Sequence, residues 1–191
     1  MFSQLRALVK GDLIAQKPKS TGFLSVLFYA RRPGFGAILL YRLSAICFGK
    51  GLLGRIASLL LVRMNLIFHA CDIDPRAVIG PGFVIGHTVG LVIGRATIGR
   101  NFRVQQNVTI GVRDITDRNF NVLPDGQYNP ASYPTIGDNV TVCAGAVVLG
   151  SIRIGNGAMI GANSVVLQDV PEGCLAVGVP ARLIVKTKVV V

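Results

Sequence analysis

The feature that most limits how this chain can fold is an aliphatic residue at every sixth position from residue 73 onward. An α-helix repeats every 3.6 residues and a β-strand every two, so neither element alone produces a period of six. A solenoid does, because each hexapeptide forms one strand and turn whose aliphatic side chain points into a continuous core. The series predicts a mainly β chain wound into a parallel β-helix. Its members are Ile73, Ile79, Ile85 and Leu91, then after a one-residue shift Val92, Ile98, Val104 and Ile110, and after an interruption Ile136, Val142, Val148, Ile154, Ile160 and Val166.

The residues three positions after several of these aliphatic residues indicate turns. Glycine and asparagine tolerate a positive φ better than other residues, and a coil must turn once in every hexapeptide. We therefore expect left-handed backbone at these positions. They are Gly82, Asn101, Asn107, Asn139, Gly145, Gly157 and Asn163.

Residues 112–135 interrupt the repeat with a polar stretch that contains aromatic residues and prolines. Inside the core its backbone groups would lack partners, so we expect a loop extruded from one edge of the solenoid. Extruded loops often build binding sites. The repeat divides the chain into a basic helical region over residues 1–70, the β-helix with its extruded loop over residues 71–170, and a C-terminal segment over residues 171–191.

Two apolar stretches precede the repeat, over residues 35–49 and 52–70. Arg42 interrupts the first, and Arg55 and Arg63 interrupt the second, so neither has the ~18 uninterrupted apolar residues of a membrane span. Apolar positions recur at intervals of three and four, which predicts two amphipathic helices. These helices could pack on the rest of the domain, dock on a membrane surface, or do both.

The positive charge of the chain is concentrated before the repeat. The net charge is +11, and residues 1–70 hold ten Lys or Arg against a single acid, Asp12. Residues 71–191 are nearly balanced, with ten basic residues and eight acids. This distribution argues against nucleic-acid binding by the whole domain. It favours either packing of the helical region or docking to an anionic membrane or lipid-linked substrate.

The cysteines and the N-terminus indicate a reducing compartment. Cys47, Cys71, Cys143 and Cys174 form no CxxC pair and are too sparse for a disulfide framework. We expect free thiols and no metal site. The first twenty residues lack the apolar core of a signal peptide. We therefore expect a cytoplasmic protein, with the inner face of the membrane as an alternative location.

The chain contains two histidines, and their contexts differ. His69 lies in an apolar helical stretch, where a packing or capping role is expected. His87 lies at a turn of the repeat, beside the one-residue shift in register. A titratable side chain at a break in a strict repeat is a candidate for function.

Several short motifs have a combination typical of one enzyme family. They are Arg32-Pro33-Gly34-Phe35, Tyr41-Arg42-Leu43, Asp72-Ile73-Asp74-Pro75, His87-Thr88-Val89-Gly90, Val108-Thr109-Ile110-Gly111, Gly161-Ala162-Asn163-Ser164-Val165-Val166 and Gly178-Val179-Pro180-Ala181-Arg182. From about residue 30 to 186 the sequence resembles the serine acetyltransferase-like branch of the hexapeptide-repeat acyltransferases. The resemblance implies a left-handed β-helix, a homotrimer and acetyl-CoA as co-substrate, with no metal.

The resemblance also implies roles for individual residues. His87 is the expected general base, which takes the proton of an acceptor hydroxyl as that hydroxyl attacks the thioester directly. Asp72, fifteen residues earlier and near the same edge of a neighbouring coil, is expected to orient the imidazole. The residues expected to bind acetyl-CoA are Ala144, Gly145, Gly161, Ala162, Arg182 and Lys186.

One departure from the family concerns the acceptor. Serine acetyltransferases have an Arg-His pair where this chain has Ser132 and Tyr133. The polar, aromatic loop suits a sugar, and the sequence is also similar to the colanic-acid type of exopolysaccharide and capsule O-acetyltransferases. We therefore expect acetyl transfer to a sugar hydroxyl in polysaccharide biosynthesis. The residues expected to bind this glycan are Arg113, Asp117, Tyr128 and Tyr133.

Two other functions remain open at this point. The first is serine O-acetylation for cysteine synthesis, for which Arg113 and Arg118 of the loop could still supply a guanidinium to the amino-acid carboxylate. The second is a catalytically silent scaffold that uses the solenoid for assembly. Loss of turnover on replacement of His87 distinguishes an enzyme from the scaffold.

Overall fold

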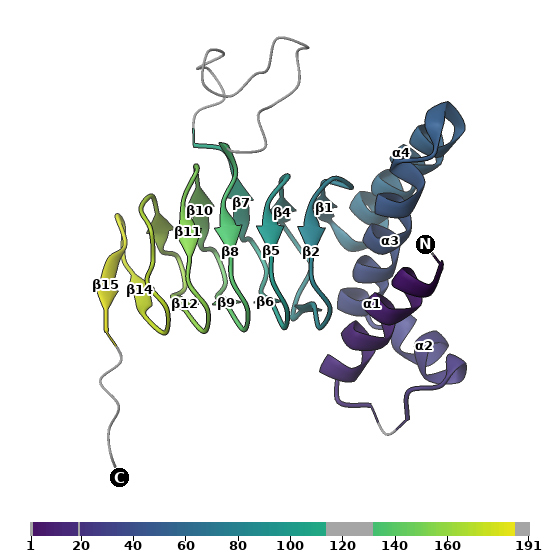
Figure 1. Cartoon of the computed structure of the whole chain (residues 1–191), viewed down its shortest axis with the longest axis horizontal. Helices are drawn as coiled ribbons and strands as arrows, with labels where there is room; N and C mark the ends of the chain where they lie inside the picture. The colour runs from purple at the N-terminus through teal and green to yellow at the C-terminus, as the bar shows by residue number, and fades with distance from the viewer. Residues whose placement is uncertain (1, 19, 114–131, 186–191) are drawn as a thin grey trace.

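A computed structural model describes residues 2–18, 20–113 and 132–185 of the chain. Figure 1 shows an elongated stack of short strands with a group of helices at its N-terminal end. Chain order runs from the helices into the stack, so the coil that contains β1 and β2 lies against the helices. The predicted parallel β-helix with an N-terminal helical segment is confirmed.

The strands form three sheets, each with one strand from most coils. The first sheet contains β1 (Cys71–Ile73), β4 (Leu91–Ile93), β7 (Thr109–Gly111), β10 (Val147–Leu149) and β13 (Val165–Val166). The second contains β2 (Val78–Ile79), β5 (Thr97–Ile98), β8 (Thr135–Ile136) and β11 (Arg153–Ile154). The third contains β3 (Val84–Ile85), β6 (Arg103–Val104), β9 (Thr141–Val142), β12 (Met159–Ile160), β14 (Leu175–Val177) and β15 (Arg182–Ile184). Among these strands only β14 and β15 pair antiparallel, which ends the stack.

The core of the solenoid consists of the predicted aliphatic positions and a second set two residues before them. Thirteen of the fourteen predicted residues are buried. Alternation along each strand also turns the residue two positions earlier inward. This second set includes Phe83 and Phe102, whose rings stack with centroids 5.7 Å apart. Burial of each large apolar side chain contributes about 1.5–3 kcal/mol.

Val92 is the exception, and the predicted register is wrong at this residue. Its side chain is 42% exposed, whereas Leu91 and Ile93 on either side are buried. Strand β4 has three residues, and a strand that buries its first and third must turn its second outward. The residue added at the register shift therefore lies on the outer surface of the first sheet.

The predicted turn residues have the expected backbone. All seven have positive φ, between 55° at Asn107 and 87° at Gly82. The asparagines also connect neighbouring coils, as in the hydrogen bond from Asn101 Nδ2 to Asn139 Oδ1 of 3.0 Å.

Four helices cover the N-terminal end of the stack in the described part of the chain. They are α1 (Phe2–Ala15), α2 (Phe23–Ala30), α3 (Pro33–Phe48) and α4 (Gly51–His69). The last two confirm the predicted pair of helices within about two residues. Helix α3 packs on the first coil through Ala37, Ile38 and Tyr41, and the Tyr41 hydroxyl donates to the Ala77 carbonyl at 2.8 Å.

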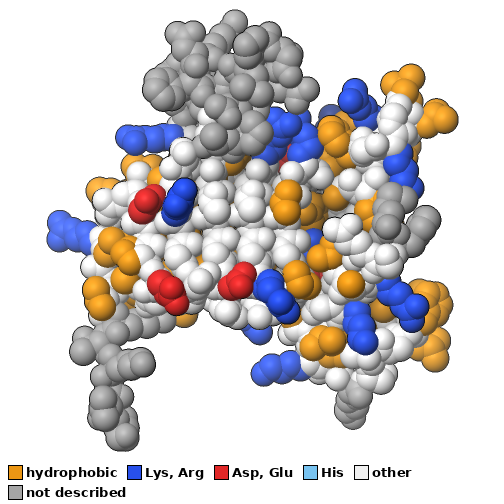
Figure 2. Space-filling view, viewed as in Figure 1, with side chains coloured by type: hydrophobic (Ala, Val, Ile, Leu, Met, Phe, Trp, Pro, Cys, Tyr) orange, Lys and Arg blue, Asp and Glu red, His pale blue; other side chains and the backbone are white. Residues whose placement is uncertain are grey.

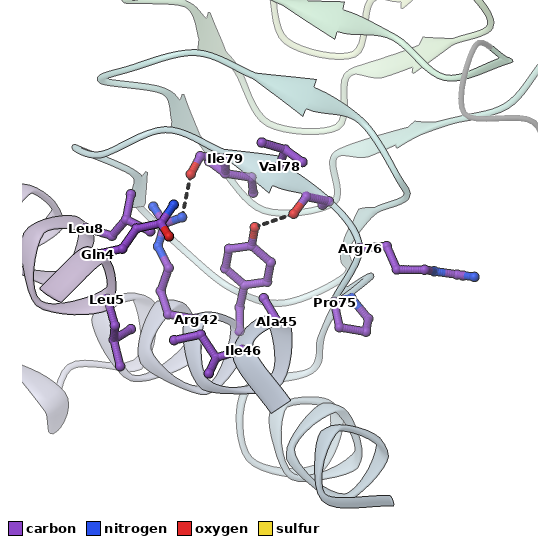
Figure 3. A pocket seen from close by; sticks show the side chains of 12 residues that line it. Gln4, Leu5, Leu8, Arg42, Ala45, Ile46, Pro75, Arg76, Val78 and Ile79 are labelled. Carbon is purple, nitrogen blue, oxygen red and sulfur yellow. Dashed lines mark hydrogen bonds between the residues drawn. The ribbon is translucent and has the colours of Figure 1, made fainter. Parts of the chain in front are cut away.

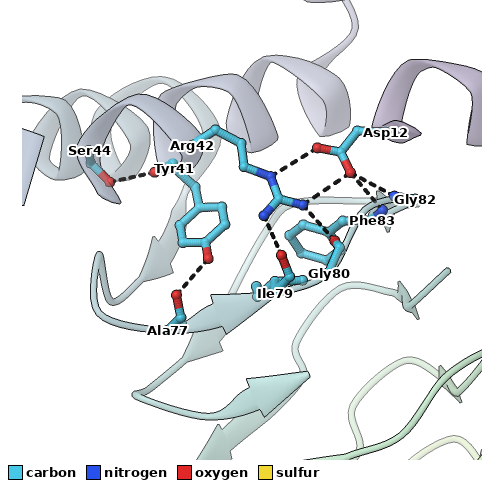
Figure 4. Close-up of polar contacts among 9 residues, drawn as sticks. All are labelled: Asp12, Tyr41, Arg42, Ser44, Ala77, Ile79, Gly80, Gly82 and Phe83. Carbon is cyan, nitrogen blue, oxygen red and sulfur yellow. Dashed lines mark hydrogen bonds and ion pairs between the residues drawn. The ribbon is translucent and has the colours of Figure 1, made fainter. Parts of the chain in front are cut away.

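A buried ion pair joins α1 to α3 and to the first coil (Figure 4). Arg42 donates to the Asp12 carboxylate and to the carbonyls of Ile79 and Gly80. Asp12 also accepts from the backbone amides of Gly82 and Phe83, each at 2.9 Å. The single acid of residues 1–70 is therefore used inside the structure.

Candidate functional site

The turns that carry the third sheet into the first lie above one another along one edge of the solenoid. We call residues 86–90, 105–107, 143–145 and 161–163 the His87 edge. Backbone hydrogen bonds connect its turns: Asn107 N donates to Val89 O at 2.9 Å, Gly145 N to Gln106 O at 3.0 Å, and Asn163 N to Ala144 O at 2.9 Å. The edge is therefore a column of closely stacked backbone.

His87 lies exposed at one end of this column, in an enlarged coil. The paired residues Cys71 and Leu91 are twenty positions apart, whereas Thr135 and Arg153 are eighteen apart. The extra residues allow the turn that contains His87 to project from the surface of the solenoid. It is nevertheless fixed, because Gly90 N donates to the Ala70 carbonyl at 2.9 Å. The His87 imidazole is therefore exposed to solvent, while a hydrogen bond fixes the backbone of the turn that carries it.

Asp72 lies on β1, in the first sheet, which borders the His87 edge. It is the exposed middle residue of a strand whose first and third residues are buried. Its Cα is paired with that of Val92, the exposed residue of β4. The Asp72 carboxylate therefore lies on the outer surface of the first sheet.

The structure places Asp72 and His87 near the same corner but does not join them directly. Among the described contacts, no side-chain hydrogen bond links the two. The Gly90–Ala70 hydrogen bond brings the His87 turn next to the residues that lead into β1. Asp72 can therefore orient an imidazole that rotates toward β1, and this role remains a prediction.

Cys71, the residue before Asp72, is not a suitable nucleophile. Its side chain is buried, and burial raises the pKa of its thiol to about 12, with the Asp72 carboxylate acting in the same direction. A thiol reacts as its thiolate, which is scarce at neutral pH when the pKa is this high. Cys71 is therefore an unsuitable site for a covalent acyl intermediate.

The structure gathers Ala144, Gly145, Gly161 and Ala162 on the His87 edge. Close stacking explains both glycines: a Cβ on Gly145 would overlap the Asn163 side chain, and one on Gly161 would lie 2.6 Å from Val177 Cγ1. Small residues also leave the backbone open to a ligand. Coils are about 4.8 Å apart, so the turn at 161–163 lies ~14 Å from the His87 turn.

The C-terminal candidates lie only partly within the described residues. Arg182 is exposed on β15, and the neighbouring Ala181 donates its amide to Val165 in the first sheet. Lys186 lies outside the described residues.

The predicted acceptor-binding residues are divided in the same way. Asp117 and Tyr128 lie outside the described residues, whereas Arg113 and Tyr133 lie at the two ends of the loop. Tyr133 packs over β4: a Cβ on Gly94 would lie 2.6 Å from its ring. The loop therefore begins and ends beside the first sheet, which also carries Asp72.

Sequence reasoning missed an ion pair near Tyr133. Arg76 donates to Asp74 through Nε at 2.9 Å and Nη2 at 2.6 Å. The hydrogen bond to Asp74 raises the pKa of Arg76, and Tyr133 adds to the rise. The Asp-x-Asp-Pro-Arg spacing at residues 72–76 was the available signal, since it sets two carboxylates and a guanidinium beside β1.

Gln106 is a second residue that the repeat does not reveal. Its side-chain oxygen is buried, and no donor reaches it within the described part of the chain. Its backbone carbonyl accepts the Gly145 amide in the His87 edge. Gln106 therefore places an unpaired acceptor just beneath the surface of the His87 edge.

A separate cavity of about 290 Å³ lies between α1, α3 and the first coil (Figure 3). Its polar side chains include Tyr41 and Arg42, which donate to backbone carbonyls of the first coil. These groups serve the packing of the helices, and the cavity is distinct from the His87 edge.

Comparison with known proteins identifies relatives along almost the whole chain. A family model described as "Bacterial transferase hexapeptide (six repeats)" matches residues 133–168. A serine acetyltransferase of Bacillus pumilus is 37% identical over 175 residues, which cover 90% of this chain and 72% of the relative. One from Synechococcus elongatus is 36% identical over 158 residues, covering 82% of this chain and 59% of the relative.

Solved structures give the same result. Serine acetyltransferase of Neisseria gonorrhoeae superposes with a TM-score of 0.78 at 32% identity, covering 95% of this chain and 66% of that one. The soybean apoenzyme superposes with a TM-score of 0.77 at 35% identity, covering 96% of this chain and 71% of that one.

These relatives correct the predicted acceptor. The expectation of a sugar hydroxyl, of polysaccharide biosynthesis and of a colanic-acid type of enzyme is wrong, because the similar curated proteins and structures are serine acetyltransferases. The departures at Ser132 and Tyr133 are outweighed by a likeness that extends over most of the chain.

The chain spans 59% and 60% of the lengths of two of these relatives and 72% of a third. Its sequence is 37% identical to the Bacillus pumilus relative over 90% of the chain, and its fold superposes on the Neisseria gonorrhoeae structure over 95% of the chain. The chain belongs to the serine acetyltransferase family of hexapeptide-repeat acyltransferases.

Proposed function

We propose that this chain transfers the acetyl group of acetyl-CoA to the hydroxyl of L-serine. The observation that carries this proposal is the extent of the likeness to serine acetyltransferases, which covers 94–97% of the chain in the solved structures. One of these structures is described as a complex with CoA and another as a complex with serine.

His87 acts as the general base in this proposal. An imidazole can accept a proton near neutral pH and return it later in the same reaction. It takes the proton of the serine hydroxyl while the oxygen attacks the thioester carbonyl. The tetrahedral intermediate then collapses, the C–S bond breaks, and the protonated imidazole gives its proton to the departing CoA sulfur. The products are O-acetylserine and CoA.

Asp72 is a positioning residue for this step. A carboxylate that accepts a hydrogen bond from one ring nitrogen leaves the other nitrogen free to act as base, and it stabilises the imidazolium that forms. Asp72 points outward from β1, next to the turn that carries His87.

The donor is proposed to lie along the His87 edge. An extended pantetheine chain carries two amides and needs backbone or side-chain partners along its length. The turns of the His87 edge follow such a path, and the small residues Ala144, Gly145, Gly161 and Ala162 leave their backbone accessible. Arg182 lies beyond the last turns, where a guanidinium suits the phosphates of CoA.

The acceptor carboxylate requires a cation that Ser132 and Tyr133 do not provide. Arg76 and Arg113 are the candidates, because Arg113 lies at the start of the loop and Arg76 interacts electrostatically with Tyr133 at its end. Arg76 is the stronger candidate, since Tyr133, at the end of the loop, interacts electrostatically with its guanidinium.

We also propose that the protein is a homotrimer, as the hexapeptide-repeat fold suggests. Flat solenoid faces can pack around a threefold axis, and a ligand edge can be shared between neighbours. Light scattering of the purified chain measures the mass directly, and a monomer at assay concentration contradicts the trimer.

The activity test follows loss of the thioester from acetyl-CoA with L-serine as acceptor. D-Serine and water serve as controls, since both leave the chemistry of the donor unchanged. The expected result is turnover that depends on L-serine and yields O-acetylserine by mass spectrometry. Absence of turnover with L-serine in a folded, CoA-binding sample contradicts the proposal.

A further inference from the structure

Helix α4 has its polarity reversed with respect to a helix of a water-soluble protein. Its buried residues are Ser58 and Asn65, whereas most of its large apolar side chains are exposed. Leu52, Leu53 and Ile67 are 75%, 81% and 74% exposed. The predicted amphipathic pattern is therefore present, but its apolar side does not face the solenoid.

Small and polar residues hold α4 close to α3. Gly54 lies against the Cys47 carbonyl so closely that a Cβ would overlap it, and Asn65 Nδ2 donates to the Ala37 carbonyl at 3.2 Å. Small residues and polar contacts between helices, with apolar residues outside, are typical of helices in an apolar solvent. Helix α3 therefore packs against the less apolar side of α4.

The exposed apolar residues lie on one side of the helix, which we call the α4 outer face, with the exposed Arg63 among them. At 100° per residue they occupy less than about two-thirds of the helix circumference. The face consists of Leu52, Leu53, Ile56, Leu59, Leu60, Met64, Leu66, Ile67 and Phe68.

Helix α2 adds a second exposed apolar surface at the same end of the molecule. None of its residues is buried, and Phe23, Leu24 and Phe28 are more than half exposed. Figure 2 shows hydrophobic side chains at this end with Lys and Arg side chains among them. Apolar patches of this kind mark interaction surfaces.

The charges beside these apolar surfaces favour a partner with negative charge. Arg55 and Arg63 are exposed on α4, and the only acid of residues 1–70, Asp12, is buried against Arg42. A second copy of the same face would bring like charges together. An anionic lipid surface would instead attract them and solvate the apolar side chains.

We propose that the α4 outer face docks the protein on the surface of an anionic lipid bilayer. By length and composition α4 could cross a membrane. Its contacts along α3, and the attachment of α3 to the solenoid through Arg42, keep it beside the first coil instead. The helix therefore lies along the lipid interface. This inference does not depend on which acceptor the enzyme uses.

The test is flotation of the full chain with two kinds of vesicle, phosphatidylcholine alone and phosphatidylcholine mixed with phosphatidylglycerol. We expect binding to the mixed vesicles that weakens with added salt. Leu52→Ser/Leu53→Ser should weaken binding about a hundredfold or more, because two exposed leucines no longer enter the interface. Arg55→Gln/Arg63→Gln should remove the preference for the anionic vesicles.

Matched controls change the same residue types elsewhere. Ile184→Ser/Val185→Ser removes two exposed aliphatic side chains at the opposite end of the stack, and Arg100→Gln/Arg103→Gln removes two exposed charges from the solenoid. Both should bind like the parent, and circular dichroism should show all four variants folded.

Three outcomes overturn the proposal. The first is absence of binding to the mixed vesicles, and the second is that the control variants weaken binding as much as the α4 variants do. The third is a concentration-dependent assembly that Leu52→Ser/Leu53→Ser dissociates while vesicle binding is absent, which would assign the α4 outer face to a second copy of the chain. Acetyl transfer to L-serine is measured separately, without vesicles. A failure of the membrane-docking proposal can therefore be told apart from a failure of the proposed activity.

Discussion

Asp12 and Arg42 form a buried ion pair across 30 residues of sequence, with Arg42 Nε 2.9 Å from Asp12 Oδ2. The same carboxylate accepts the amides of Gly82 and Phe83. One acidic side chain thus attaches α1 to α3 and both helices to the first coil, which is the coil that carries Asp72 and His87.

Loss of this carboxylate should destabilise the protein. Asp12→Asn leaves the Arg42 guanidinium buried without a counter-charge, and we expect the free energy of unfolding to fall by about 3–5 kcal/mol. Urea unfolding followed by circular dichroism measures the change. Asp12→Asn/Arg42→Leu should recover part of it, because the uncompensated charge is gone; a double variant less stable than the single one contradicts this explanation.

Replacement of His87 should abolish most turnover. Without a general base, His87→Ala should lower kcat by about 10²–10⁴-fold while the fold and CoA binding remain. Initial rates with acetyl-CoA and L-serine give the measurement. His69→Gln is the matched control and should keep kcat close to the parent's. Full activity of His87→Ala would show that His87 is not the general base.

His69 should make stability depend on pH. Burial lowers the pKa of this imidazole below its ordinary value of 6.5, and its Nδ1 has no partner in the described structure. The unfolded chain then binds a proton more readily than the folded chain, so stability falls as the pH drops through about 6.5. The loss is complete below the folded-state pKa. Unfolding midpoints at several pH values should show this fall, and His69→Gln should reduce it; an unchanged slope contradicts the assignment.

The left-handed turns should reject β-branched residues. Asn139 has a φ of 58°, which costs an L-residue with a bulky side chain about 1–2 kcal/mol. Asn139→Val should therefore lower the melting temperature more than Asn139→Gly, although both remove the hydrogen bond with Asn101. Equal melting temperatures would show that the hydrogen bond, and not the backbone conformation, accounts for the loss of stability.

The site was predictable where it depends on the repeat. The period of six determines which turns stack on one edge, so His87, Gly145 and Gly161 could be placed together from their spacing. Gln106 could not, because its burial depends on side-chain packing between coils that the spacing does not describe, whereas Arg76 had a local signal in the Asp-x-Asp-Pro-Arg spacing. The predicted acceptor was wrong because two loop positions, taken alone, carry less information than a likeness over the whole chain.

The sequence by itself determined the solenoid, because burial at every sixth position is a local, periodic requirement that only stacked coils satisfy. It also determined the left-handed turns, since glycine and asparagine are required by the backbone at those positions. Only the tertiary structure decided that Val92 faces outward, that Asp12 pairs with Arg42, and that α4 turns its apolar side away from the solenoid. These depend on which surfaces meet, and a pattern of apolar residues shows that a helix has an apolar side without showing what that side contacts.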